Sequence, residues 1–226
     1  MEKKVALVVG GLRGIGKAVS CKLAQSGFIT YATSRANVQE ISEDILIPLQ
    51  LDLTCEKDIH KVFEMLDEKH GKLDVLVNNA GISSPGPFEN ADSNEWDSLF
   101  QTNVFGIFSC TQKAFPLLKE QGGRIINISS ITTKKPLPQN AIYTASKHAL
   151  NGLGETLAEE WYPHKVLTTN ILLGATYTDL WKGVDAFSPE DMLDVKEVGR
   201  IVSFIASTPL SVRIDELILT PPKGVL

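Results

Sequence analysis

Tyr143 and Lys147 are the two residues whose types and spacing most directly suggest chemistry. Residues four apart lie on one face of a helix, so a phenol and an ammonium group would meet there. A tyrosine hydroxyl loses its proton near pH ~10, and a neighbouring cation favours the phenolate. A pKa lowered to about 7 would make Tyr143 a proton donor, at a cost of roughly 4 kcal/mol of differential stabilisation. The spacing alone also fits a tyrosine packed on a lysine stem.

A glycine-rich turn follows the first apolar run of the chain. The segment from Lys3 to Val9 has the length of a strand, and Gly10, Gly14 and Gly16 come directly after it. Residues 15–25 then have the apolar spacing of a helix. Glycines at such a turn let the backbone approach a diphosphate closely, and the helix N-terminus attracts the anion. The turn indicates a nucleotide site, although glycine turns after strands are structural in many proteins.

A second apolar run, residues 73–77, ends in Asn78-Asn79-Ala80-Gly81. Its composition is typical of a buried parallel strand. Small residues at that strand end suit a ligand lying over the C-terminal edge of a sheet, where open α/β folds bind nucleotides. A plain Asn-Ala-Gly turn is the alternative interpretation.

Taken together, these segments resemble the short-chain dehydrogenase/reductase family, whose members combine Thr-Gly-x-x-x-Gly-x-Gly, Asn-Asn-Ala-Gly and Tyr-x-x-x-Lys in this order. The resemblance covers nearly the whole chain. Four further positions agree with the family, namely Asp52, Asn103, Ser130 and Thr178. The family membership would imply NAD(P)-dependent oxidation of CH–OH or reduction of C=O groups.

The expected fold is α/β: a single-domain Rossmann fold over residues 1–226 with a doubly wound, seven-stranded parallel sheet and helices on both faces. Alternating patterns predict strands near Val5, Ile29, Ile47, Val75, Ile126, Leu167 and Leu217. A long helix is expected from about Asp92 to Glu120, kinked or ended by Pro116. Between the second and third strands, Ser34 to Asp44 leaves room for a short helix at most.

Four residues are implied to carry catalysis. Tyr143 would exchange the proton, Ser130 would hold the substrate oxygen, and Lys147 would lower the pKa of Tyr143 and bind the nicotinamide ribose. Asn103 would hold a water that returns protons from solvent, or would simply bond to the backbone of a neighbour. Ser129 is the adjacent competitor of Ser130, but strand alternation and the family spacing both favour Ser130.

The resemblance also implies a set of cofactor-binding residues. These are Gly10, Arg13, Gly14, Ile15, Gly16, Ser34, Arg35, Asp52, Leu53, Asn79, Ala80, Gly81, Tyr143, Lys147, Gly174, Thr176 and Thr178. An acid at the end of the second strand would select NAD, whereas this chain has Ser34 followed by Arg35, with Arg13 in the glycine turn. Two guanidinium groups can bracket a 2′-phosphate, so we expect NADP(H) to be preferred over NAD(H). The alternative is that both arginines are solvated surface charges.

Composition excludes several classes of function. A net charge of −5 without a basic tract argues against nucleic acid or an anionic membrane as the main partner. The cysteines Cys21, Cys55 and Cys110 and the four histidines lack metal-ligand spacing, so no metal site is expected. No run is long enough to span a membrane, and the chain enters a strand at once without a signal sequence, so a cytoplasmic protein is expected. The family expectation is a homo-oligomer, dimer or tetramer, formed through the helices beginning near Asp92 and Ala141.

Some positions depart from the family pattern. Val9 replaces the usual threonine before Gly10, which puts the rigidity of the glycine turn in doubt. Leu173 replaces the usual proline before Gly174. The tail from Ser211 to Gly224 lacks the Asp-Gly-Gly common in the family and resembles the branch of NADP-dependent carbonyl, hydroxy-acid and diketone reductases.

The predicted function is reduction of a ketone, diketone or 3-oxoacyl compound by NADPH, or the reverse reaction, under an apolar substrate lid at about 175–193. Core packing of the same lid residues is an equal alternative. The competing functions are a catalytically silent NADPH sensor that contacts a protein partner, and a sugar-nucleotide epimerase. The intact Ser130, Tyr143 and Lys147 argue against the first, and the short chain after Leu173 argues against the second.

Overall fold

The computed structural model describes residues 2–36, 38, 45–179 and 188–224. Seven parallel strands form one sheet in the order β3-β2-β1-β4-β5-β6-β7, which confirms the predicted Rossmann fold. Each strand falls where the sequence predicts one: β1 Val5–Val9, β2 Ile29–Ser34, β3 Leu46–Gln50, β4 Val75–Asn78, β5 Gly123–Ser130, β6 Val166–Leu173 and β7 Glu216–Leu219. Most of the predicted short connection at 34–44 and the centre of the predicted lid lie outside the described residues.

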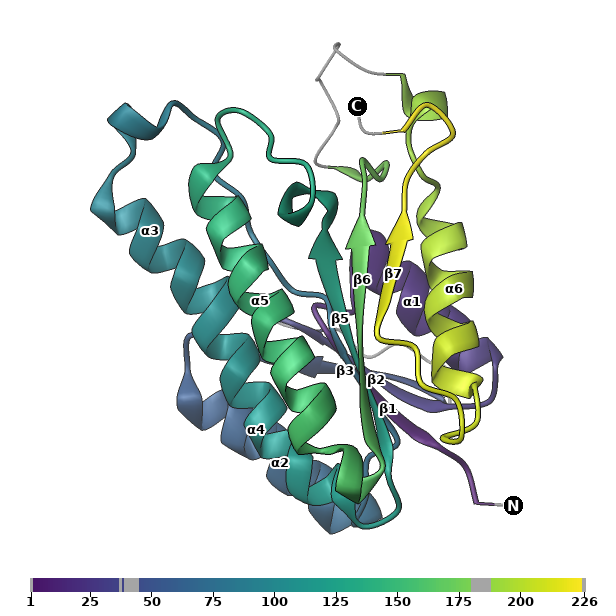
Figure 1. Cartoon of the computed structure of the whole chain (residues 1–226). Helices are drawn as coiled ribbons and strands as arrows, with labels where there is room; N and C mark the ends of the chain where they lie inside the picture. Colours follow the sequence, from purple (N-terminus) through teal and green to yellow (C-terminus); the bar gives the residue numbers. More distant parts are fainter. Residues whose placement is uncertain (1, 37, 39–44, 180–187, 225–226) are drawn as a thin grey trace.

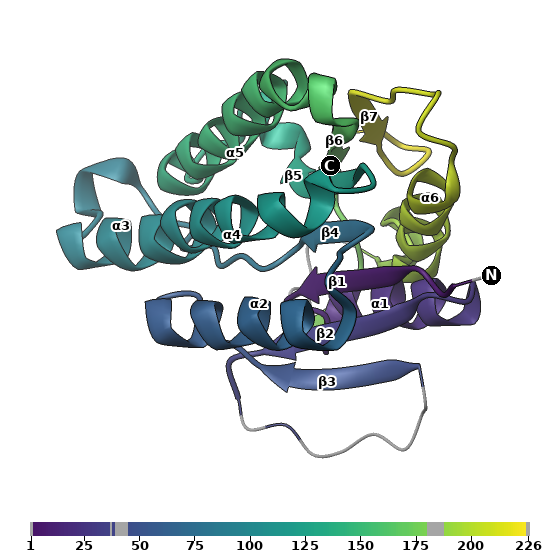
Figure 2. The ribbon, with the colours of Figure 1, turned by 90° about the horizontal axis from the view of Figure 1, so that it is seen from below.

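Helices cover both faces of the sheet (Figures 1 and 2). Helices α1 (Gly14–Gln25) and α6 (Val195–Ser207) lie on one face, while α2 (Glu56–His70), α4 (Ile107–Lys119) and α5 (Ala141–Glu160) lie on the other. The central strands are therefore buried on both sides, which explains why they read as continuous apolar runs rather than alternating ones. Among the described residues, the two largest apolar clusters lie one on each face of the sheet.

The predicted long helix over 92–120 is a composite. Helix α3 (Ser93–Phe100) continues through a π-helical segment, Gln101–Gly106, into α4. Pro116 neither ends nor interrupts it, because α4 runs to Lys119. The irregularity lies instead at the π-helical segment, a feature that often marks functional sites.

The strand order reverses between β1 and β4, and this reversal determines where a ligand can bind. After β1 the chain continues toward β2 on one side, and after β4 it continues toward β5 on the other side. These opposite directions leave a crevice at the carboxyl ends of β1 and β4. The glycine turn after Val9 and the Asn-Asn-Ala-Gly segment after Val77 lie at that same edge. The fold thus brings together two segments almost seventy residues apart in the chain.

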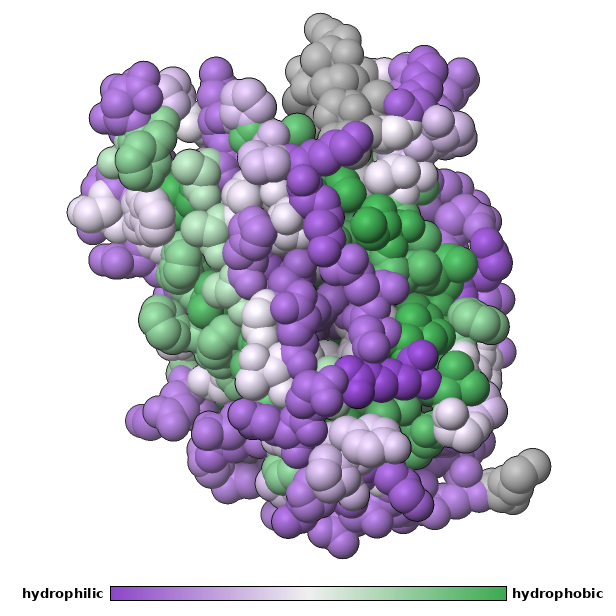
Figure 3. All heavy atoms as spheres, in the orientation of Figure 1, coloured by the Kyte–Doolittle hydropathy of each residue, from purple (hydrophilic) through white to green (hydrophobic). Residues whose placement is uncertain are grey.

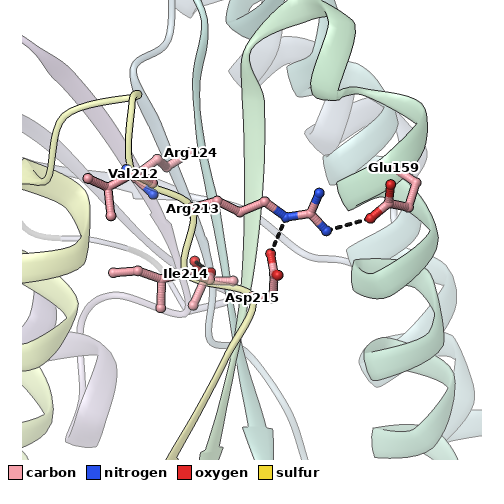
Figure 4. Close-up of polar contacts among 7 residues, drawn as sticks. Arg124, Glu159, Val212, Arg213, Ile214 and Asp215 are labelled. Carbon is pink, nitrogen blue, oxygen red and sulfur yellow. Dashed lines mark hydrogen bonds and ion pairs between the residues drawn. The ribbon is translucent and has the colours of Figure 1, made fainter.

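Two arginines hold the connection between α6 and β7 (Figure 4). The guanidinium of Arg124, a buried residue of β5, donates to the carbonyl oxygens of Thr208, Pro209 and Val212. Arg213, on the surface, bridges Asp215 and Glu159 of α5. These contacts fix the last strand against the sheet and against α5.

Candidate active site

The glycine turn and the Asn-Asn-Ala-Gly segment are held against each other. Asn79 Nδ2 donates to the carbonyl of Gly10 at 2.9 Å. Gly10 has φ +75°, and a Cβ at Gly16 would lie 2.0 Å from the Gly10 oxygen, so neither position tolerates a side chain. Ala80 packs directly on Gly10, where a Cβ would meet the Ala80 Cα at 2.9 Å. Asn79 and Ala80 therefore shape the turn, a role that the sequence did not predict for them.

A threonine from another strand compensates for Val9. Gly10 N donates to Thr33 Oγ1 of β2 at 3.1 Å, and Ser20 Oγ of α1 donates to the Gly11 carbonyl at 2.9 Å. Both hydroxyl residues are buried. The turn is thus tied from β2, α1 and the segment after β4, and the doubt raised by Val9 does not apply. Nothing in the sequence pattern marked Thr33 or Ser20 for this role.

The start of α1 fits a diphosphate. Its N-cap residue, Arg13, has an extended backbone and makes no side-chain hydrogen bond to the helix, so it does not cap the first N–H groups. Gly14 has φ +51° and faces Thr178, whose methyl group would lie 3.5 Å from a Cβ there. Ile15 is half-buried and packs on the core between α1 and α6. The turn, the uncapped helix start and Thr178 together form a cradle of the right chemistry for an NAD(P) diphosphate.

The residues predicted on the adenosine side differ in their exposure. Arg13 and Arg35 are exposed, and Ser34 is half-buried with its Oγ accepting from Ala36 N. Asp52 Oδ1 accepts from the backbone and hydroxyl of Thr54, and these bonds, with a smaller contribution from Arg35, lower the pKa of Asp52. Leu53 is buried against Gly106, where a Cβ would lie 2.6 Å away.

The residues predicted after β6 take part in the local backbone structure. Gly174 N donates to the Leu219 carbonyl at 2.8 Å, and Thr176 Oγ1 donates to the Gly174 carbonyl at 3.0 Å. Thr176 is buried and pairs in parallel with Leu193, which brings together the two ends of the predicted lid segment.

Helix α5 carries Tyr143 and Lys147 on one face, as predicted. Lys147 Nζ lies 5.6 Å from the centre of the Tyr143 ring and donates to the Ile128 carbonyl at 2.9 Å. Gly81 lies beside them, since a Cβ there would be 3.6 Å from Lys147 Nζ and 3.4 Å from Asn103 Oδ1. The Tyr-x-x-x-Lys helix and the Asn-Asn-Ala-Gly segment therefore meet at one place.

Burial dominates the ionisation of this pair. It lowers the pKa of Lys147 to about 8, because a charged ammonium loses its hydration there. Burial also raises the pKa of Tyr143, and the hydroxyl of Ser130 opposes that rise only in part. For the protein without its cofactor, desolvation is therefore the dominant influence on the Tyr143 pKa, and the effect of Lys147 on this pKa stays a prediction.

Ser130 ends β5 next to Tyr143. Its Oγ accepts from Thr132 N at 3.2 Å, which begins a short 3₁₀ turn, and its contact with the Tyr143 hydroxyl lowers the pKa of the phenol. Ser129 Oγ is buried and has no hydrogen-bond partner among the described residues. As expected, Ser130 rather than Ser129 is the serine that contacts the Tyr143 hydroxyl.

Asn103 lies in the π-helical segment and is buried. Its Oδ1 accepts from Ile82 N at 2.8 Å, and its Nδ2 donates to the Ile82 carbonyl at 2.8 Å and to Ser146 Oγ at 3.1 Å. Both N–H groups are thus used within the protein. The predicted bonding to a neighbour's backbone is present and fixes the loop after Gly81 against α5, while the role in holding a water stays a prediction.

Within the described parts of the chain, no three His, Cys, Asp or Glu side chains gather as metal ligands would. Over those same residues, no helix combines the length and apolarity that a membrane span requires.

The sequence matches the family model of the short chain dehydrogenases over residues 4–189. The chain belongs to this family. Farnesol dehydrogenase of Aedes aegypti is 31% identical over 96% of both chains, and the 3-oxoacyl-(acyl-carrier-protein) reductase FabG of Staphylococcus aureus is 30% identical over 90% of this chain and 91% of its own. The solved structure of ElxO with NADP bound superposes with a TM-score of 0.89 at 28% identity, covering 96% of this chain and 97% of ElxO.

Membership of the short chain dehydrogenase family identifies the protein as an NAD(P)-dependent oxidoreductase that acts on CH–OH or C=O groups of small molecules. The similarity extends through the glycine turn, the Asn-Asn-Ala-Gly segment and the Tyr-x-x-x-Lys helix, all of which lie within the matched residues.

Proposed function

We propose that the protein reduces the carbonyl group of a ketone, diketone or 3-oxoacyl compound to an alcohol with NADPH, or catalyses the reverse oxidation. The observation that carries this proposal is the convergence of Ser130, Tyr143 and Lys147 beside Gly81, at the edge where the glycine turn also lies. A proton donor, a hydrogen bond to an oxygen and a cation are thereby placed next to a nucleotide cradle.

NADPH would supply a hydride to the carbonyl carbon and leave as NADP⁺. Tyr143 gives its proton to the carbonyl oxygen, so that the substrate gains two electrons and two hydrogens in total and becomes the alcohol. Ser130 Oγ holds that oxygen by a hydrogen bond as negative charge develops on it. Lys147, fixed by the Ile128 carbonyl, provides the positive charge that stabilises the phenolate left on Tyr143. Asn103 keeps the loop after Gly81 in place.

The preference for NADPH over NADH rests on charge at the adenosine rim. Ser34 stands where an acid would accept from a ribose 2′-hydroxyl, while Arg13 and Arg35 are exposed and free to approach a 2′-phosphate. The structural relative ElxO has been solved with NADP bound, which supports the same choice.

Tyr143→Phe tests the chemistry, with Tyr162→Phe as its control because Tyr162 is exposed and away from α5's catalytic face. The substrates are a panel of ketones, diketones and a 3-oxoacyl thioester, and NADPH binding is measured in parallel by fluorescence. We expect Tyr143→Phe to lose at least about 100-fold in turnover with intact NADPH binding. If the wild-type protein binds NADPH but none of the carbonyl compounds causes it to oxidise NADPH, the catalytically silent sensor is the better function.

A further inference from the structure

The catalytic face of α5 continues beyond Lys147 to Asn151, one turn further along. Asn151 is buried, and its Nδ2 donates to Thr133 Oγ1 at 3.1 Å. The Thr133 hydroxyl in turn donates to the carbonyl oxygen of Ser130 at 2.9 Å. One hydroxyl therefore links the helix that carries Tyr143 and Lys147 to the backbone of Ser130.

The other end of Asn151 is tied to a row of asparagines inside the sheet. The backbone carbonyl of Asn151 accepts from Asn170 Nδ2 at 3.1 Å. Asn170 Oδ1 accepts from Asn127 Nδ2, and Asn127 Oδ1 accepts from Asn78 Nδ2, each at 2.9 Å. These three residues are directly paired across β4, β5 and β6, and each is at most 2% exposed.

Helix α5 lies close against this row because Gly154 has no side chain. A Cβ at Gly154 would lie 2.2 Å from Asn170 Oδ1 and 2.8 Å from Asn127 Nδ2. Asn127 also directly precedes Ile128, whose carbonyl holds Lys147. The row therefore fixes the depth of α5 on the sheet, while Thr133 and Asn151 link that helix to the end of β5.

From these contacts we infer that Thr133 and Asn151 are positioning residues, which together set the separation between Ser130 and the Tyr143–Lys147 face of α5. The hydrogen bonds of the asparagine row are buried and the two bonds of Thr133 are partly buried. Buried hydrogen-bond networks are strong and rigid, and a small displacement of a reacting group costs much rate. The inference rests on the proposed function for its rate readout, but the linkage itself is a property of the fold.

Thr133→Val is the decisive variant because it keeps the shape of the side chain and removes both hydrogen bonds. Thr132→Val is the matched control, since Thr132 Oγ1 is buried and has no partner among the described residues. Thr133→Ser keeps the hydroxyl and should restore kcat to the wild-type value. We expect Thr133→Val to lower kcat with 2,3-butanedione or the best carbonyl found about tenfold, with KM and the Kd for NADPH within about twofold of wild type.

A second measurement needs no substrate. The ultraviolet absorbance of tyrosinate is followed against pH in each protein, and the step due to Tyr143 is assigned by difference from Tyr143→Phe. A displaced Ser130 withdraws the hydrogen bond that favours the phenolate, so the step should move to higher pH in Thr133→Val and return in Thr133→Ser. Among the described residues, the Tyr143 hydroxyl contacts Ser130 of β5, Lys147 lies over its ring from the same face of α5, and Ser146 Oγ donates to its backbone carbonyl.

The two readouts separate the two proposals. If wild-type protein reduces no carbonyl, but the Tyr143 step still moves in Thr133→Val and not in Thr132→Val, the positioning role stands while the proposed function fails. If the step and kcat are the same in Thr133→Val as in Thr132→Val, or if Thr133→Ser fails to restore them, Thr133 is not a positioning residue and the inference is wrong.

Discussion

Gly10 N donates to Thr33 Oγ1 across 3.1 Å, so β2 supplies the hydroxyl that ties the glycine turn in a chain with valine at position 9. The backbone N–H of Gly10, a half-buried residue just past the end of β1, faces the buried Thr33. An unpaired donor there would cost about 1–3 kcal/mol. Thr33 therefore keeps the cradle in a shape that can accept a diphosphate.

Thr33→Val should weaken NADPH binding about fivefold, because loss of one hydrogen bond of about 1 kcal/mol loosens the turn. Thr30→Val is the control on the same strand, since Thr30 Oγ1 donates to the Phe28 carbonyl far from the turn. The measurement is a fluorescence titration with NADPH. Equal affinities for Thr33→Val and Thr30→Val would show that the turn does not depend on Thr33.

Arg35→Ala should weaken NADPH binding more than tenfold and leave NADH binding nearly unchanged, because only NADPH carries the 2′-phosphate that a guanidinium can pair with. The effect should shrink as the salt concentration rises. Arg200→Ala is a suitable control, since that exposed arginine pairs with Glu197 on α6. The NADP preference is wrong if NADH binds as tightly as NADPH, or if Arg35→Ala weakens both cofactors alike.

Phe105→Glu should dissociate a homo-oligomer built on the helices that begin near Asp92 and Ala141. Phe105 lies between α3 and α4 and is 56% exposed, so burial of its ring against a second copy would stabilise association. A second hydrophobic surface lies over α6 and β7 (Figure 3), where Phe204 is 62% exposed. Sedimentation velocity of Phe105→Glu and Phe204→Glu distinguishes the two surfaces, and dissociation by Phe204→Glu alone would contradict the predicted one.

The sequence was sufficient for the fold and for the meeting of Tyr143, Lys147 and Gly81. Parallel strands buried on both faces appear as apolar runs, and a helix fixes the Tyr-x-x-x-Lys spacing locally, so these features need no tertiary information. The end of each strand also predicts which residues reach the sheet edge. That is why the three motifs were predicted to lie together.

What the sequence did not predict depends on contacts between distant segments. Thr33 and Ser20 read as ordinary strand and helix residues, because their roles appear only when β2 and α1 flank the turn. Asn78, Asn127 and Asn170 form a row only through the register of β4, β5 and β6. The desolvation that raises the pKa of Tyr143 was not predicted for a related reason: spacing identifies the nearby Lys147, whereas burial of the phenol depends on how deeply the helix is packed.

Lys147→Met should abolish turnover and yet stabilise the fold at pH 7. Burial lowers the pKa of Lys147 from 10.5 in the unfolded chain to about 8 in the folded protein. Below pH 8 both states are protonated, so the full cost of burying the ammonium, about 3 kcal/mol, is present. Methionine removes that charge at similar volume and loses only the bond to the Ile128 carbonyl, about 1 kcal/mol. The variant should therefore be more stable by about 2 kcal/mol.

The difference should depend on pH with a definite sign. Between pH 8 and 10.5 the unfolded chain binds more protons at Lys147 than the folded protein, so wild-type stability rises with pH relative to the variant. Urea unfolding of both proteins at pH 6, 7, 8, 9 and 9.5 measures the difference between their free energies of unfolding. Titratable groups that both proteins share cancel in that difference. The stability advantage of Lys147→Met should be constant up to about pH 8 and then shrink. A pH-independent difference would mean that the ammonium is not held at a desolvation cost, and the charge on Lys147 would then have to be compensated within the folded protein.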